Sequence, residues 1–252
     1  MNNFDIYFPL VLASLAGMCT LLGSLIFFLF KDIRKSHLQF FMGLSAGVMI
    51  YVSFVELFAH AITNIGFLKA NLAFFFGIGL VMLLDFLVPH QYLEETNISR
   101  GADSKMLKAG LLVAMGIAIH NFPEGVAVFV GSVANIKLGI ALAVAIALHN
   151  IPEGIAVSIP VYFATKSRKK ALFYSFLAGI VEPVGAVVAL LFLMPFLTST
   201  ILYTSFAVVA GIMVFISFDE LLPMSYCGER AHLSIFGVIL GMLIMALSLH
   251  AL

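Results

Sequence analysis

The chain consists mainly of long runs of apolar residues that are separated by short polar stretches. Each run is long enough to cross a bilayer as a helix, because the hydrocarbon core needs about 20 apolar residues. We therefore predict an all-α, multi-pass membrane protein with eight transmembrane helices. The predicted spans cover residues 8–30, 38–62, 69–88, 107–131, 136–163, 170–194, 200–223 and 232–251, and the longest connection is a polar loop at 89–106.

The composition agrees with this pattern and excludes several classes of protein. Of the 252 residues, 62% are hydrophobic and 10% are charged, and the mean hydropathy is +1.13, whereas a soluble domain carries about a quarter charged residues. The net charge is zero and there is no basic tract, so no nucleic-acid partner is expected. Two cysteines are too few for a thiolate metal cluster. We expect a single domain, residues 1–252, without a cleaved signal peptide.

The lysines and arginines predict the orientation of the chain. Eleven of the 13 lie in the connections after spans 1, 3, 5 and 7, and only Lys69 and Lys137 lie on the other side. Because cytoplasmic loops are enriched in Lys and Arg, both termini are predicted to lie outside the cytoplasm and the 89–106 loop inside it. The expected location is the cell (inner) membrane.

The sequence also contains an internal repeat. Residues 47–57 (Gly-Val-Met-Ile-Tyr-Val-Ser-Phe-Val-Glu-Leu) match residues 211–221 (Gly-Ile-Met-Val-Phe-Ile-Ser-Phe-Asp-Glu-Leu). Shorter matches pair span 1 with span 6, where 15–17 repeats as 177–179, and span 3 with span 8. Each match joins an odd span to an even one, so the partners cross the membrane in opposite directions. This pattern predicts a 3+2+3 inverted-repeat helical bundle, an architecture that secondary transporters use around a midplane substrate site.

Acidic side chains occur within the predicted spans or near their ends, whereas all 13 Lys and Arg residues lie in the connections or at helix ends. An ionisable group at bilayer depth costs roughly 2.5–3.5 kcal/mol on insertion scales. These acids must therefore be protonated, hydrated or bound to cations. The seven carboxylates are Glu56, Asp85, Glu124, Glu153, Glu182, Asp219 and Glu220.

Two of these acids belong to a motif that occurs twice, at residues 120–125 (His-Asn-Phe-Pro-Glu-Gly) and 149–154 (His-Asn-Ile-Pro-Glu-Gly). Successive residues of a helix are rotated by about 100° about its axis. The carboxylate of the motif therefore projects in a direction between those of the imidazole and the amide. Imidazole, amide and carboxylate groups together favour a divalent transition metal. Two such helices face to face could hold two ions that share the carboxylates. The predicted metal ligands are His120, Asn121, Glu124, His149, Asn150 and Glu153.

The prolines support the same interpretation. Pro123 and Pro152 each leave a backbone carbonyl without its helical donor and kink the helix, and in lipid that carbonyl needs another partner such as water or a cation. Glu182 precedes Pro183 in the sixth span and is predicted to be a further oxygen ligand.

Five other residues are candidates for the ion pathway. Glu56 lies toward the outer end of span 2, and Met49 and Ser53 lie within the two helical turns before it. Asp219 and Glu220 approach the cytoplasmic end of span 7. For each of them, packing or a hydrated position at a helix end is the alternative.

At these motifs the sequence resembles the ZIP (ZRT/IRT-like) family of divalent metal transporters, and especially a bacterial branch with His-Asn-x-Pro-Glu-Gly in both spans 4 and 5. The resemblance covers essentially the whole chain. It implies a binuclear site at mid-membrane, with one ion held by His120, Glu124, His149 and Glu153. The other ion would be held by Asn121, Glu124, Asn150, Glu153 and Glu182. It also places Met49 and Glu56 on the entry side of span 2.

The resemblance further implies import toward the cytoplasm, a homodimer, and movement of spans 1, 4, 5 and 6 against spans 2, 3, 7 and 8. One departure concerns the 89–106 loop, where many relatives carry a His-rich stretch and this chain has only His90. Metal sensing by this loop is therefore not expected.

We interpret the chain as an importer of divalent transition-metal cations and not as an enzyme. Zinc and iron(II) are the main expected substrates, with manganese, cobalt and cadmium as further candidates, because imidazole with carboxylates suits zinc and oxygen-only sites suit harder ions. The expected partners are these ions, the lipid bilayer and a second copy of the chain, and no prosthetic group is expected.

Two alternatives come from other classes of protein. A membrane-embedded metalloenzyme, such as an intramembrane protease, would use His-Glu-x-x-His, which the sequence lacks. A proton-coupled carrier of an organic cation would use the acids but would leave the two histidines and two asparagines of the motifs unexplained.

Overall fold

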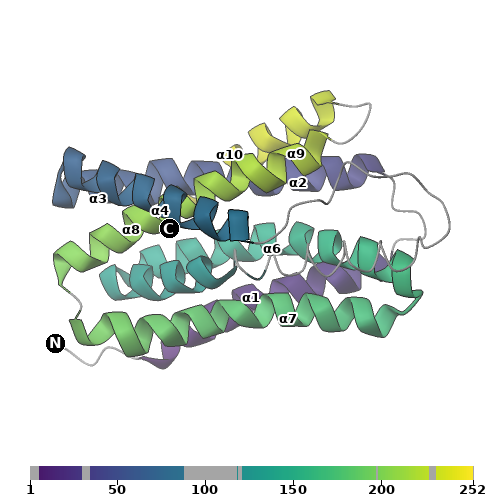
Figure 1. Cartoon of the computed structure of the whole chain (residues 1–252), viewed down its shortest axis with the longest axis horizontal. Coiled ribbons are helices and arrows are strands. Elements are labelled where there is room, and N and C mark those ends of the chain that lie inside the picture. The colour runs from purple at the N-terminus through teal and green to yellow at the C-terminus, as the bar shows by residue number, and fades with distance from the viewer. Residues whose placement is uncertain are drawn as a thin grey trace.

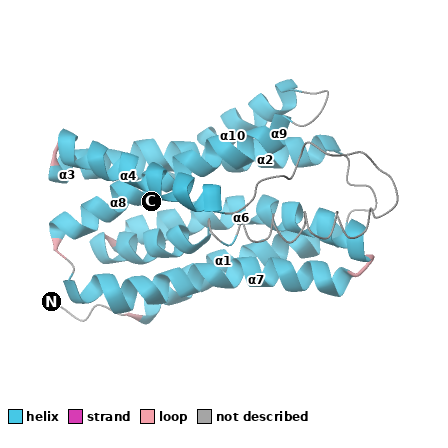
Figure 2. Ribbon diagram, viewed as in Figure 1, coloured by secondary structure: helices cyan, strands magenta, loops and turns pink. Residues whose placement is uncertain are grey.

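The computed structural model describes residues 6–29, 35–87, 118, 121–196, 198–226 and 231–251. Within these residues all regular structure is helical (Figure 2). The helices are α1 (Tyr7–Leu29), α2 (Lys35–Tyr51), η1 (Val52–Phe58), α3 (Ala59–Ile65), α4 (Phe67–Leu87), a helical stretch at 121–134, α6 (Ile136–Thr165), α7 (Arg168–Val188), η2 (Ala189–Leu193), η3 (Met194–Phe196), α8 (Ser199–Ile216), η4 (Ser217–Leu221), α9 (Leu222–Tyr226) and α10 (Ala231–Ala251). The predicted 89–106 loop lies outside the described residues.

The distribution of side chains is that of a protein in lipid. Six helical segments are long and apolar enough to cross a membrane, and a shorter apolar segment covers Phe67–Leu83. Large apolar side chains such as Phe75 and Phe236 are more than half exposed, whereas Glu124, His149 and Glu182 are fully buried. Apolar groups outside and ionisable groups inside are stable only where hydrocarbon surrounds the protein. The prediction of a multi-pass, all-α membrane protein is thus confirmed.

Short connections set the antiparallel order of neighbouring helices. Asn135, Ser167 and Thr198 are N-caps whose side-chain oxygens accept hydrogen bonds from the first turns of α6, α7 and α8. Gly66 joins α3 to α4 with a φ of 83°, a value that favours glycine. Each of these turns reverses the chain within a few residues, so consecutive helices pack side by side.

The helices form two groups, which occupy the lower and upper halves of Figure 1. The first group contains α1, α6, α7 and the 121–134 helix, and α1 packs extensively on both α6 and α7. The second group contains α2, α3, α4, α8 and α10, in which α2 pairs with α10 and α4 pairs with α8. The main contact between the groups joins α2 to α6.

Glycines bring the helices of each group into backbone contact. A Cβ atom added at Gly23 would overlap the carbonyl of Ile151, and one at Gly211 would overlap that of Phe74. Every close approach at a described glycine joins two helices of the same group. Small residues of this kind allow dispersion contacts between backbones, which are the main source of helix association in lipid.

The inverted repeat of the sequence is visible in these contacts. Gly125 meets the backbone of Glu182, and the equivalent Gly154 meets that of Thr20, the residue equivalent to Glu182 in the span 1/span 6 match. Gly17 and Gly179, which are also equivalent, meet each other. The first group therefore has an approximate two-fold relation that exchanges α1 with α7 and the 121–134 helix with α6.

The repeated segments of spans 2 and 7 share a further local feature. Both are π-helical, in η1 and η4, and both π-helical stretches contain Ser-Phe-x-Glu-Leu. The apolar pattern predicts a helix at both places but does not reveal the wider turn. Such turns are rare and occur frequently at functional sites.

Candidate metal centre

Three ligand-type side chains meet in the interior of the first group. Glu124 comes from the 121–134 helix, and His149 and Glu153 come from α6. All three are fully buried, and one ligand atom from each lies within 4.8 Å of the others. Nε2 of His149 is 2.9 Å from Oε1 of Glu124. The two copies of the motif thus meet across two helices, and the close backbone contacts of Gly125 and Gly154 hold those helices in place.

The two motif asparagines are oriented by neighbouring backbones. Nδ2 of Asn121 donates to the carbonyl of Ala178 at 3.0 Å, and Nδ2 of Asn150 donates to that of Ala16 at 2.9 Å. Ala16 and Ala178 are equivalent residues of the repeat, so the two contacts obey the same two-fold relation. Because each amide nitrogen is fixed in this way, each Oδ1 atom is free to act as an acceptor or a ligand.

Glu182 connects α7, a third helix of the first group, to this centre. Nδ2 of Asn150 also donates to Oε2 of Glu182 at 2.8 Å, and the Glu182 side chain is fully buried. The repeat is asymmetric at this position, because the equivalent residue on α1 is Thr20. A carboxylate is therefore present on one side of the approximate two-fold axis and a hydroxyl on the other.

Several buried oxygens of the centre have no hydrogen-bond partner among the described residues: Oε2 of Glu124, Oε1 of Glu182 and Oδ1 of both Asn121 and Asn150. Buried polar atoms are nearly always paired, so each of these needs an explanation. No Lys or Arg occurs in the sequence between 138 and 165 or between 171 and 229. Oxygen atoms clustered in this way match the donors that a divalent cation requires.

The remaining predicted site residues are not members of this cluster or lie outside the described part of the chain. His120 and the side chains of Asp85 and Glu220 lie outside the described part. Met49 and Ser53 are fully buried, and Asp219 is exposed. The described cluster itself contains only Glu124, His149 and Glu153.

The structure also adds residues that the sequence pattern did not single out. Nε2 of His60 lies 3.1 Å from Oε1 of Glu56, in a partly exposed pair four residues apart. The i,i+4 spacing of an acid and a histidine on a helix could have indicated this contact. The buried hydroxyl of Thr20 has no hydrogen-bond partner in the described chain. The match between spans 1 and 6 aligns Thr20 with Glu182 and could have indicated this residue.

The fold and the buried centre define the class of this molecule as an integral membrane protein with a buried cluster between its helices that could hold a metal ion. The family model described as ZIP zinc transporter matches residues 90–249. Proteins named zinc transporter ZupT match nearly the whole chain. That of Akkermansia muciniphila is 47% identical over 95% of both chains, and that of Oceanobacillus iheyensis is 48% identical over 99% of this chain and 98% of the relative. The chain belongs to the ZIP zinc transporter family, and it is therefore a transporter and not an enzyme.

Proposed function

We propose that this protein imports divalent transition-metal cations, zinc and iron(II) first among them, through a binuclear site at mid-membrane. The observation that carries the proposal is the meeting of Glu124, His149 and Glu153 in a fully buried cluster. The sequence has no Lys or Arg at 121–134 or at 138–165, the segments that contribute these side chains. Carboxylates buried in this way must be protonated, hydrated or bound to a cation, and the imidazole beside them favours a bound metal ion. A site that lies deep within membrane-crossing helices can pass that ion from one side to the other.

The proposed ligands divide into two sets that share Glu124 and Glu153. His120 and His149 complete the nitrogen-containing set, which suits zinc. The other set adds the amide oxygens of Asn121 and Asn150 and the carboxylate of Glu182, which suits harder ions such as iron(II) or manganese. The hydrogen bonds from Asn121 and Asn150 to carbonyls of α7 and α1 fix the orientation of these ligands.

We propose that transport involves movement of the first helix group against the second. The close backbone contacts at the described glycines lie within the groups, and the same glycines make none between them. Each group is therefore held as a unit, whereas the interface between α2 and α6 lacks glycine-mediated contacts of this kind and can slide. Because the metal cluster lies inside the first group, it would move with that group.

The proposed direction is toward the cytoplasm, with both termini outside it in the inner membrane. The distribution of Lys and Arg supports this orientation. Met49, Ser53 and Glu56 would then lie on the entry side, and Asp219 and Glu220 toward the exit. A homodimer is also part of the proposal, and light scattering of the protein in detergent tests it.

Flux of radioactive zinc into proteoliposomes tests the proposed function. The purified protein is expected to carry zinc inward, and an excess of unlabelled iron(II), manganese, cobalt or cadmium is expected to reduce that flux according to its fit to the site. Liposomes without protein give the background. A rate of zinc entry equal to that background would refute the proposal.

Replacement of His60 tests the entry side of the pathway. A partly exposed carboxylate with a histidine beside it raises the local concentration of cations, so His60→Ala is expected to raise the half-saturating zinc concentration roughly 2- to 5-fold and leave the maximal flux nearly unchanged. His250→Ala is the matched control, because His250 is exposed near the C-terminal end of α10 on the same predicted side. If zinc flux depends on zinc concentration in the same way in both variants and in the wild type, a role for His60 is excluded.

A further inference from the structure

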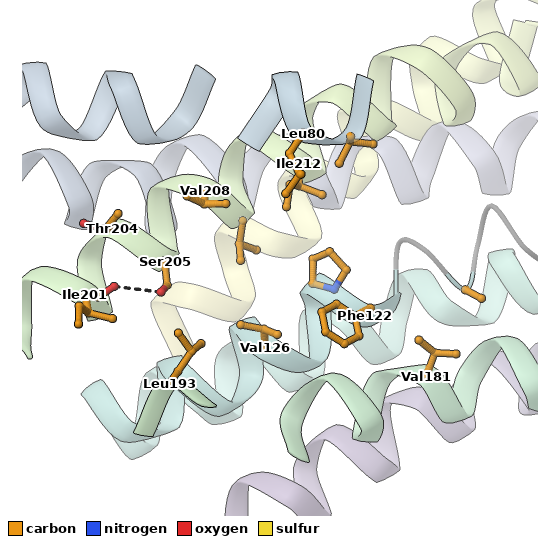
Figure 3. A pocket seen from close by; sticks show the side chains of 14 residues that line it. Leu80, Phe122, Val126, Val181, Leu193, Ile201, Thr204, Ser205, Val208 and Ile212 are labelled. Carbon is orange, nitrogen blue, oxygen red and sulfur yellow. Dashed lines mark hydrogen bonds between the residues drawn. The ribbon is translucent and has the colours of Figure 1, made fainter. Parts of the chain in front are cut away.

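A cavity of about 730 Å³ lies between the two helix groups. Its wall on the first group includes Phe122, Val126 and Leu193, and its wall on the second includes Leu80 and Val208. Figure 3 shows Phe122 and Val126 on the opposite side of the cavity from Val208 and Ile212. The cavity is therefore bounded by both of the units that we propose to move.

The lining of the cavity is apolar. Among the described residues that line it, only Thr204 and Ser205 are polar, and the hydroxyl of Ser205 donates to the carbonyl of Ile201 at 2.9 Å. This described part of the lining has no charged group to hold an ion or a lipid headgroup. Apolar cavities exclude water and accept hydrocarbon, and one of this volume is within the range of ligand sites.

The position of the cavity indicates which hydrocarbon can reach it. The α8 segment and the segment Arg168–Phe196, which contributes Val181 and Leu193, are candidate membrane spans, and Leu80 lies in the apolar stretch Phe67–Leu83. Leu80 is itself partly exposed at the outer surface of the bundle. The medium at that surface is the bilayer, so the apolar molecules available at high concentration are acyl chains.

The cavity also adjoins the metal motif directly. Phe122 and Pro123 line it, and in the sequence they lie between the proposed ligands Asn121 and Glu124. Anything that fills the cavity therefore packs against the same helical turn that carries metal ligands on its other side. A void here would leave that turn without dispersion contacts.

We propose that this cavity binds one acyl chain of a membrane phospholipid, which packs between the two helix groups and stabilises their described arrangement. The binding site follows from the cavity itself. The effect on transport rests on the proposed function, because only a carrier whose groups move apart would need to expel or rearrange the chain.

Tryptophan fluorescence tests the binding site, since the sequence contains no tryptophan. Phe122→Trp places a single fluorophore in the cavity wall, and the probe is phosphatidylcholine with brominated acyl chains, which quench tryptophan on contact. Quenching is expected to approach that of Phe75→Trp, because the Phe75 side chain is 63% exposed on the surface of an apolar helical segment. Quenching as weak as that of Phe206→Trp, at a buried position, would overturn the proposal. Leu193→Trp is the replacement if the first variant does not fold.

A second substitution separates the cavity from the general lipid surface. Val208→Phe, added to Phe122→Trp, fills the cavity and is expected to remove most of the quenching. Val187→Phe is the control, because Val187 faces lipid on α7 and does not line the cavity. Unchanged quenching in the Val208→Phe variant would show contact with surface lipid only and would overturn the proposal.

Zinc flux tests the functional part of the inference. Val208→Phe alone is expected to lower the flux roughly 2- to 10-fold, the usual range for changes that alter coupling between two states, without changing the affinity for zinc. Val187→Phe is expected to match the wild type. A flux in Val208→Phe equal to that of the wild type would exclude a role of the chain in transport. Absence of zinc flux in the wild type would instead refute the proposed function, while the quenching experiment would still decide the binding site.

Discussion

Glu153→Ala is expected to abolish zinc flux in proteoliposomes, with a loss of at least roughly 100-fold. Glu153 is fully buried, lies in the cluster with Glu124 and His149, and is proposed to bind both ions. Even residues that only orient metal ligands cost about 10- to 100-fold when they are removed, so loss of a shared ligand should cost at least as much. Initial rates of radioactive zinc uptake measure the effect.

A second variant at the same position separates loss of the ligand from loss of packing. Glu153→Gln keeps the volume of the side chain and removes its charge, and it is expected to be nearly as inactive as Glu153→Ala. Both variants should elute from gel filtration as the wild type does. Uptake at the wild-type rate by either well-folded variant would exclude Glu153 as a ligand.

Gly23→Ala and Gly211→Ala are expected to destabilise the protein strongly. The new Cβ atoms would overlap the carbonyls of Ile151 and Phe74, so the paired helices must move apart. Overpacking of this kind costs about 1–3 kcal/mol, which corresponds to a fall in Tm of roughly 2–12 °C for a chain of this size. Thermal unfolding in detergent, followed by circular dichroism, measures the change in Tm of each variant. Gly23→Ala perturbs a contact within the first helix group, and Gly211→Ala perturbs one within the second.

Gly79 offers a matched control on α4. A Cβ atom added there meets, among the described residues, no atom within 4 Å beyond its chain neighbours and the nearby backbone of its own helix. Since alanine is favoured over glycine in a helix by about 1 kcal/mol, Gly79→Ala is expected to keep or slightly raise the Tm. Equal Tm values for Gly79→Ala and Gly23→Ala would contradict the view that backbone contact at glycines holds the first group together.

Much of the candidate site could be predicted because its signals are local in the sequence. A histidine, an amide and a carboxylate within five residues, repeated 29 positions later in an apolar run, identified both helices of the centre. The structure brings Glu124 to 2.9 Å from His149, a contact between the two copies. The repeat between 47–57 and 211–221 likewise predicted the inverted arrangement, because similar segments fold alike whichever way they cross the membrane.

Other features depend on contacts between distant segments and leave no periodic signal. The carbonyl partners of Asn121 and Asn150 lie 57 and 134 residues away, and nothing in the motif specifies them. The π-helical turn at Val52–Phe58 has the same apolar pattern as an ordinary helix. The cavity behind Phe122 arises from the fit of two helix groups, which the pattern within each helix cannot determine.

The most direct test of the central claim is anomalous diffraction at the zinc edge from crystals of the zinc-loaded protein. The predicted result is a peak within about 2.0–2.2 Å of carboxylate oxygens of Glu124 and Glu153 and of a ring nitrogen of His149, which are the usual zinc–ligand distances. A zinc-loaded structure with no peak at bonding distance from these three side chains, or with the side chains turned toward lipid, would contradict it.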